Sequence, residues 1–246
     1  NPFAVQEIAD ALKGTDKIVL VKNPVNPDLA LWIGALERLS GAGIRNLGVI
    51  HRGFSTYQKT KYRNVPNWQI ALDFKNQFPE IPMLVDPSHI CGNRTGLFSV
   101  AQEALNIGYQ GVMVETHCNP DAAWSDAKQQ VTPEVLAGMI EKLKVRDTEI
   151  SAFDEDMDRF RTLISDIDFQ LIELLSQRMK VSEHIGSLKK VHNAAVFQPD
   201  RWKVITEYAA RKAEETQMSK EFIEKLFKSI HEQSVEIQNK IMNDKK

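Results

Sequence analysis

Cysteine is scarce in this sequence of 246 residues, which contains only Cys91 and Cys118. Two cysteines are too few for a disulfide framework, and they do not form a metal-binding motif made of cysteines. The sequence also has no apolar run of the length of a signal peptide or a membrane span. We therefore expect a protein of the reducing cytoplasm.

The sequence also lacks an excess of charge of one sign. It has 31 basic and 33 acidic residues, so its net charge of -2 indicates no bias towards nucleic acid or an anionic membrane. It has no glycine-rich loop of the dinucleotide-binding type, which argues against a Rossmann domain. The remaining composition is that of a globular protein, 42% hydrophobic and 26% charged, with enough residues for two cores.

Strand-like and helix-like segments alternate in the first part of the chain. Short runs of Val, Ile and Leu predict strands at Lys17–Val21, Leu47–Ile50, Met83–Val85 and Val112–Val114. Helical spacing predicts helices at Asp28–Leu39, Trp68–Phe78, Leu97–Ile107 and Pro133–Leu143. Apolar strands separated by helices are typical of a parallel sheet. Four such units form either an open doubly wound sheet or half of an eight-stranded (β/α)8 barrel.

Polar residues follow every predicted strand. They are Lys22 after the first, His51 and Arg52 after the second, Asp86, Ser88 and His89 after the third, and Glu115 and His117 after the fourth. In (β/α)8 barrels the carboxyl ends of the strands meet at one mouth, which carries the chemistry. This pattern favours the barrel and predicts one shared site.

A metal site is one interpretation of His89, Glu115 and Asp126. One imidazole nitrogen and two carboxylates suit a divalent ion such as Mn, Fe, Co or Zn. The alternative is structural, with His89 capping a loop and Asp126 starting a turn. The residues alone leave both interpretations open.

Five ordered motifs carry a resemblance to a known family. They are Val19–Pro24 (VLVKNP), Val49–Gly53 (VIHRG), Leu84–His89 (LVDPSH), Val112–His117 (VMVETH) and Trp124–Gln129 (WSDAKQ). This region resembles the later strands of 3-deoxy-D-arabino-heptulosonate 7-phosphate (DAHP) synthase of the shorter beta subtype. The resemblance implies a metal-dependent (β/α)8 barrel that condenses phosphoenolpyruvate with erythrose 4-phosphate. It also implies that His89, Glu115 and Asp126 bind the metal and that Lys22 and Arg52 hold phosphoenolpyruvate.

The resemblance covers only the second half of that barrel, from Asn1 to about Leu143. The family's fourth metal ligand, a cysteine, and its Lys-Pro-Arg segment for the sugar phosphate belong to the first half. We expect about 110 further residues upstream in the natural protein, because four units cannot close a barrel. Synthase activity is not expected of a chain that begins at Asn1. The alternative is the related 3-deoxy-D-manno-octulosonate 8-phosphate (KDO8P) synthase, which uses arabinose 5-phosphate.

The hydrophobic period changes across the polar stretch Lys144–Ser151. We therefore place one domain at residues 1–147 and a second, all-helical domain at residues 148–246. Helices are predicted from about Met157 to Val191, from Pro199 to about Glu215, and from Ser219 to Met242.

A heptad seam of apolar residues runs from Met157 to Leu188 and is interrupted by Arg178. A buried guanidinium needs an anion, which is either a structural carboxylate or a ligand. Lys189 lies eleven residues further on, so it projects from nearly the same face. Arg161 lies about a quarter-turn away from that stripe, so we expect it to point elsewhere, into a neighbouring chain.

Residues from Arg161 to Lys240 resemble the all-α chorismate mutase family. The matching positions are Arg161, Arg178, Lys189, Arg201, Ser234 and Gln238. The resemblance implies an interleaved homodimer in which Arg178 and the partner's Arg161 bind the two carboxylates of chorismate. It also implies that Lys189 and Gln238 donate to the ether oxygen, while Ser234 lines the pocket and Arg201 adds positive charge. Such a site of fixed donors is sufficient for a pericyclic rearrangement.

The sequence departs from that family at Gln198 and Trp202, where acidic side chains commonly receive the substrate hydroxyl. Gln198 can accept a hydrogen bond, but Trp202 can only donate one. This exchange predicts a lower mutase turnover. The alternative from another class is a non-catalytic module for dimerisation and for sensing prephenate. In either case, chorismate or prephenate bound to the helices is expected to regulate the barrel by feedback.

Overall fold

The computed structural model describes residues 2–57, 59–146 and 154–244. The chain divides into two compact units, residues 1–150 and 151–246. The predicted boundary between residues 147 and 148 lies outside the described residues. We call the two parts the α/β unit and the helical unit, and each is described by itself.

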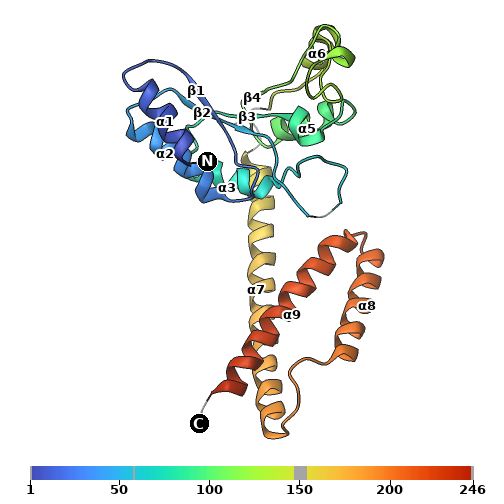
Figure 1. Cartoon of the computed structure of the whole chain (residues 1–246). Coiled ribbons are helices and arrows are strands. Elements are labelled where there is room, and N and C mark those ends of the chain that lie inside the picture. Colours follow the sequence, from blue (N-terminus) through green and yellow to red (C-terminus); the bar gives the residue numbers. More distant parts are fainter. Residues whose placement is uncertain (1, 58, 147–153, 245–246) are drawn as a thin grey trace. The chain divides into compact units, whose positions relative to one another are not determined.

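The α/β unit contains a parallel sheet of four strands, β1 (Val19–Lys22), β2 (Leu47–His51), β3 (Met83–Val85) and β4 (Gly111–Val112). The order in the sheet follows the order in the chain, β1-β2-β3-β4 (Figure 1). Doubly wound sheets reverse their strand order at a switch point, whereas barrel strands pair in sequence. The observed order therefore confirms the barrel-like arrangement over the residues described.

Helices connect and flank these strands. They are α1 (Pro2–Leu12), α2 (Leu29–Gly41), α3 (Trp68–Gln77), α4 (Pro87–Cys91), α5 (Leu97–Asn106) and α6 (Pro133–Ile140), with a short 3₁₀ helix, η1, at Pro120–Ala122. Two of the starts are capped as their sequences predict. Asp28 accepts a hydrogen bond from the Leu31 amide at 3.1 Å, and Thr132 caps α6 at Val135 with Pro133 in the first helical turn.

The core of the α/β unit lies between its strands and helices. Trp32 on α2 lies against Phe74 on α3 with ring centroids 4.8 Å apart and the rings tilted by 31°, and both side chains are fully buried. Met83 and Val85 of β3 belong to the same cluster. Burying one side chain of the size of Phe74 stabilises the fold by about 2 to 3 kcal/mol.

Several details differ from the sequence-based expectation. The first strand is Val19–Lys22 rather than Lys17–Val21, so Lys22 ends the strand instead of following it. The fourth strand is Gly111–Val112 rather than Val112–Val114, because Met113 makes only one backbone bond, to Val85, before the chain leaves the sheet. The short helix α4 was not predicted, because five residues are too few to show a period.

His51 was expected among the polar residues of the strand ends, but it lies in the core. The imidazole is fully buried, with Tyr109 Oη 2.9 Å from Nδ1 and the Pro66 carbonyl oxygen 2.6 Å from Nε2. A carbonyl can only accept, so Nε2 carries the proton and Nδ1 accepts from the tyrosine hydroxyl. Burial lowers the pKa of His51 to about 4, so the ring is neutral at pH 7.

The helical unit contains three helices, α7 (Asp154–Val191), α8 (Pro199–Glu215) and α9 (Lys220–Asn243). Helix α9 packs against both α7 and α8 (Figure 1). Gly186 allows the close approach of α7 and α9, because a Cβ atom there would lie 3.2 Å from the Cα atom of Gln238. Ser219 caps α9, as predicted, by accepting from the Phe222 amide at 3.3 Å.

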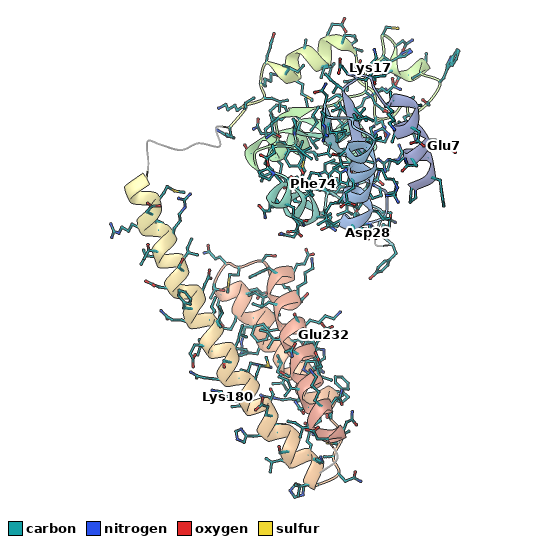
Figure 2. The ribbon with its side chains drawn as sticks, turned by 90° about the vertical axis from the view of Figure 1, so that its left-hand side faces the viewer. Glu7, Lys17, Asp28, Phe74, Lys180 and Glu232 are labelled. Atoms are coloured by element: carbon teal, nitrogen blue, oxygen red, sulfur yellow. The ribbon has the colours of Figure 1, made fainter. Side chains whose placement is uncertain are left out.

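The N-terminal part of α7 extends beyond α8 and α9 (Figures 1 and 2). Its exposed large apolar residues are Met157, Phe160, Leu163, Ile164, Ile167, Phe169, Leu171, Ile172 and Leu174. Within the described residues, the predicted heptad seam is thus mostly uncovered. Among these residues, no helix is both long enough and apolar enough to span a membrane.

Two candidate active sites

The first candidate site lies at the carboxyl ends of the four parallel strands. Lys22 ends β1, Arg52 follows β2, His89 follows β3 and Glu115 follows β4. The parallel sheet brings these ends to one side, as the sequence predicts.

His89, Glu115 and Asp126 form a cluster with the spacing of a metal site. One potential ligand atom from each residue lies within 4.8 Å of the other two. The Nε2 atom of His89 is 3.8 Å from a carboxylate oxygen of Glu115. One imidazole and two carboxylates fit a borderline divalent ion. The residues present therefore suit the metal that the sequence motifs imply, while its identity is left open.

Asp86 holds two residues of this site in place. It is buried, with 1% of its side chain exposed, and its Oδ2 atom is 2.9 Å from Lys22 Nζ and 2.8 Å from His89 Nδ1. Its Oδ1 atom accepts from the His89 amide at 3.0 Å, which caps α4. The Nδ1 contact lacks the geometry of a hydrogen bond, since this buried nitrogen has no hydrogen-bond partner among the described residues. Asp86 thus holds His89 through its amide and a close contact with the ring, while Nε2 lies on the side of Glu115.

Arg63 and Gln129 join the two acidic ligands into one network. Arg63 Nη1 donates to Asp126 at 2.9 Å and to the side-chain oxygen of Gln129 at 2.8 Å. Gln129 in turn donates to Glu115 at 2.7 Å. Gly92 leaves room for this arginine, because a Cβ atom at its φ of +65° would lie 2.6 Å from the Cβ of Arg63.

Arg52 has an unused donor in this site. Its Nη1 atom is buried and has no hydrogen-bond partner among the described residues. Its backbone amide is fixed by Asn23, whose side-chain oxygen lies 2.6 Å away. Burial lowers the pKa of Arg52, and nearby Asp86 raises it in opposition. An unpaired guanidinium nitrogen held in this way is suited to a phosphate or carboxylate ligand.

The second candidate site is a cavity of about 360 Å³ within the helical unit. We call it the helical cavity. Its lining residues are Arg178, Val181, Ser182, Ile185, Lys189, Val196, Gln198, Arg201, Trp202, Ile205, His231, Ser234, Val235 and Gln238. The cavity therefore brings together all the pocket residues that the sequence predicts from one chain, which are Arg178, Lys189, Gln198, Arg201, Ser234 and Gln238.

Neutral groups hold the two cations of α7. Arg178 Nη1 donates to the hydroxyl of Ser234, which also receives a bond of 3.2 Å from Ser182. Lys189 Nζ donates to Gln238 Oε1 at 3.0 Å and to the Val196 carbonyl at 2.6 Å. Since Gln238 accepts from Lys189 through its oxygen, its amide nitrogen can still donate hydrogen bonds to another group.

Three cations and no carboxylate line the helical cavity. Burial, followed by the charge of Arg201, lowers the pKa of Arg178, and burial lowers the pKa of Lys189. Among the described residues, no Asp or Glu forms an ion pair with any of the three. The described residues thus supply no structural carboxylate for Arg178, and an anionic ligand stays a prediction.

Arg161 lies outside the helical cavity. Its side chain is exposed and its Nη1 atom is 3.3 Å from Asp158, one turn earlier on α7. This position agrees with the expectation that Arg161 turns away from Arg178 and Lys189. Whether it enters a partner's cavity stays a prediction.

Sequence reasoning missed several residues of these sites. Arg63 and Gln129 lie near the metal cluster, while Ser182 and His231 line the helical cavity. His231 stacks on Trp202 with ring centroids 4.3 Å apart. Ser182, four residues after Arg178, and His231, three residues before Ser234, were detectable from helical spacing, but Arg63 and Gln129 depend on tertiary contacts.

Two family descriptions match the chain. A family model described as "DAHP synthetase I family" matches residues 4–152, and one described as "Chorismate mutase type II" matches residues 160–239. The two matches correspond to the α/β unit and the helical unit.

Relatives of the α/β unit include the Phospho-2-dehydro-3-deoxyheptonate aldolase of Thermotoga maritima, 26% identical over 129 residues, 52% of this chain and 38% of that protein. The 2-dehydro-3-deoxyphosphooctonate aldolase of Nitrobacter winogradskyi is 27% identical over 157 residues, 58% of this chain and 53% of that protein.

A Bifunctional chorismate mutase/prephenate dehydratase of Buchnera aphidicola is 30% identical over 88 residues, 36% of this chain and 23% of that protein.

A similar solved structure is a truncated form of 3-deoxy-D-arabino-heptulosonate 7-phosphate synthase from Thermotoga maritima. It has a TM-score of 0.52 at 24% identity, over 57% of this chain and 54% of that one. At this identity the likeness supports the fold alone. The chain spans 38% and 53% of the two aldolase relatives.

Proposed function

We propose that this chain, which belongs to the DAHP synthetase I family through residues 4–152, is part of a bifunctional enzyme of aromatic amino-acid biosynthesis. Its second part is a chorismate mutase type II domain at residues 160–239. The natural protein would condense phosphoenolpyruvate with erythrose 4-phosphate to DAHP and would rearrange chorismate to prephenate. The observation that carries the second activity is a cavity lined by three cations without a carboxylate.

In the α/β unit, Lys22 and Arg52 would bind the phosphate and carboxylate of phosphoenolpyruvate. The orphaned Nη1 of Arg52 supports this role, because the site offers it no protein acceptor among the described residues. His89, Glu115 and Asp126 would hold a divalent ion, which supplies Lewis acidity at the aldehyde of the second substrate. Asp86 keeps Lys22 and His89 in register, so that both substrates are positioned before reaction.

In the helical unit, fixed donors would stabilise a rearrangement in which an ether bond breaks. Arg178 would bind one carboxylate, and Arg201 of α8 would add positive charge to the same cavity. Lys189 and the amide nitrogen of Gln238 donate to the ether oxygen as its negative charge grows. Ser234 holds the Arg178 guanidinium in place, and Gln198 can accept from the substrate hydroxyl.

A homodimer through α7 would complete this site. The exposed apolar residues from Met157 to Leu174 need a cover, and a contiguous exposed apolar surface of this kind marks an interface. Arg161 lies on the same stretch and would bind the second carboxylate in the partner's cavity. Sedimentation at micromolar concentration tests the dimer, and Ile164→Glu, on the exposed face, is expected to weaken it.

Chorismate turnover tests the helical site directly. The intact chain is expected to convert chorismate to prephenate, at a reduced rate because Trp202 stands where an acceptor is usual. Binding of prephenate without turnover would instead favour the non-catalytic sensor. Failure of both would contradict the proposal for the helical unit.

Metal binding tests the α/β site separately. We expect the chain to bind Mn²⁺ and His89→Ala to lose that binding, measured by equilibrium dialysis. His117→Ala is the matched control, because His117 lies near the site but outside the cluster. Unchanged Mn²⁺ binding by His89→Ala would contradict this ligand set.

The natural full-length protein is needed to decide the sugar substrate. Erythrose 4-phosphate is expected to be preferred, and preference for arabinose 5-phosphate would favour the KDO8P synthase alternative. Feedback predicts that prephenate changes synthase kinetics in the same protein. We also propose a cytoplasmic location, which two free thiols, one of them exposed, support.

A further inference from the structure

His231 lies in the wall of the helical cavity but has no role in the chemistry assigned above. It is on α9, three residues before Ser234, so both side chains lie on one helical face. Its Nε2 atom is shielded from solvent and has no hydrogen-bond partner among the described residues. Buried polar atoms are rarely left unpaired, so this nitrogen suggests a missing ligand.

Aromatic contacts hold the imidazole in position. Trp202 of α8 stacks on it with an interplanar angle of 25°, and Phe197 contacts it edge to face at 6.0 Å. Two ring contacts restrict the side-chain rotations of His231. The imidazole is therefore a preorganised part of the cavity rather than a freely rotating side chain.

The charges around His231 favour its neutral form. Burial lowers its pKa, as do Arg178 and Lys189 on α7, while Glu232 on α9 raises it. Arg201 of α8 adds a further positive charge to the same cavity. A neutral imidazole has one nitrogen that accepts a hydrogen bond.

Few free acceptors line this cavity. The side chains of Arg178, Lys189, Arg201 and Trp202 can only donate hydrogen bonds. The side-chain oxygens of Ser234 and Gln238 already accept from Arg178 and Lys189, so Gln198 and His231 are the remaining candidates to accept from a ligand. A ligand with two carboxylates satisfies such donors, but a hydroxyl on the same ligand needs a group that accepts. His231 is placed to provide one.

We propose that His231 is a specificity-determining residue whose imidazole accepts the hydrogen bond of the ring hydroxyl of the bound dicarboxylate. This inference rests on the proposed mutase or sensing function of the helical unit. In this proposal His231 and Trp202 together take the role of the acidic side chain that accepts the substrate hydroxyl in related proteins. Trp202 positions the ring, and His231 accepts the hydrogen bond while the proton stays on the hydroxyl oxygen.

The test compares two ligands in three forms of the full chain. The ligands are chorismate and an analogue that lacks the ring hydroxyl. The proteins are the unmodified chain, His231→Phe, which keeps a ring on Trp202 but removes both nitrogens, and the matched control His184→Phe. His184 lies on the exposed surface of α7 and does not line the cavity. Circular dichroism confirms that each variant folds.

For His231→Phe, kcat/KM with chorismate should fall about tenfold, whereas with the hydroxyl-free analogue it should change less than about twofold. If the unmodified chain binds without turnover, the same comparison is made with the Kd of each ligand. Equal losses for both ligands, or no loss, would overturn the inference and leave His231 a packing residue. A chain that neither binds nor converts chorismate would overturn the proposed function as well.

A second readout uses pH. The unmodified chain should lose kcat/KM for chorismate as pH falls through the lowered pKa of His231, because the imidazolium no longer accepts. His231→Phe should lack this acid limb, while His184→Phe should retain it. An identical acid limb in His231→Phe would contradict the role of the imidazole.

Discussion

The charged side chains of the α/β site mostly have partners of opposite charge, whereas those of the helical cavity have only neutral ones. Lys22 pairs with Asp86 and Arg63 with Asp126, each at 2.9 Å. Arg178 instead donates to Ser234. Ion pairs therefore stabilise the first site, whereas the cations of the second site repel one another unless an anion is bound.

This difference has consequences for stability. In a connected network, removal of one charge leaves its partner buried and unpaired, which is costly. In a cavity whose charged side chains are all cations, removal of one charge relieves repulsion. Removal of a charge should therefore lower both function and stability in the α/β site, but only function in the helical cavity.

Arg178→Ala is expected to have the largest effect. Loss of a fixed donor to a carboxylate should reduce mutase kcat/KM by about 10³-fold or more. The melting temperature should change little or rise, because Arg178 and Arg201 no longer repel each other. Chorismate consumption and a thermal melt measure the two effects.

Arg211→Ala is the control for this prediction, since Arg211 is exposed on α8 and pairs with Glu215. It should leave the mutase rate unchanged. Loss of folding in Arg178→Ala would contradict the comparison, because it would show that this guanidinium is structural.

Acid should destabilise the α/β unit through His51. Its folded pKa of about 4 lies below the unfolded value of 6.5, so the unfolded chain binds the proton first. The stabilisation is complete above pH 6.5 and decreases as pH falls towards 4, by about 3 kcal/mol in total.

Urea unfolding followed by tryptophan fluorescence measures this effect, because Trp68 contacts His51 with ring centroids 5.2 Å apart. The unfolding midpoint should fall between pH 6.5 and 4.5. His117→Ala should show the same fall, because His117 is only partly buried and lies outside the core cluster. A constant midpoint over this range would show that the folded and unfolded chains bind this proton equally, and would contradict the lowered pKa of His51.

Asp86→Asn should have the smallest of the three effects. The amide cannot neutralise Lys22 and orients His89 less strongly, so Mn²⁺ affinity should fall about ten- to a hundredfold. The α/β unit should also lose about 1 to 3 kcal/mol of unfolding free energy. Dialysis and urea unfolding measure these effects.

Asp121→Asn provides a matched control, because Asp121 pairs with Arg94 at the surface and outside the metal cluster. It should change neither quantity by much. Equal Mn²⁺ affinity in Asp86→Asn and the unmodified chain would show that His89 needs no carboxylate to orient it.

The helical site was the more predictable of the two from sequence. Helical geometry fixes which residues share a face, so Arg178 and Lys189 could be placed together from their spacing of eleven residues. Ser234 and Gln238 follow the same logic, being four residues apart on α9. Their common cavity then required only the packing of α9 on α7.

The α/β site was predictable in outline only. Strand ends indicated the edge where Lys22 and His89 meet, because parallel strands present their carboxyl ends on one side. They did not indicate the direction of His51, whose side chain enters the core. Successive side chains of a strand point to opposite faces, so an uncertainty of one residue in the strand end leaves open whether a side chain lies in the core or in the site.

The sequence by itself determined the two-part organisation, the parallel βα units, the three long helices and the residue types of both sites. These follow from local periodicity, capping and motif order, which are properties of neighbouring residues. Only the tertiary structure decided that Asp86 links Lys22 to His89 and that His231 stacks on Trp202. Such contacts join residues far apart in the chain, and the packing of whole elements sets their geometry.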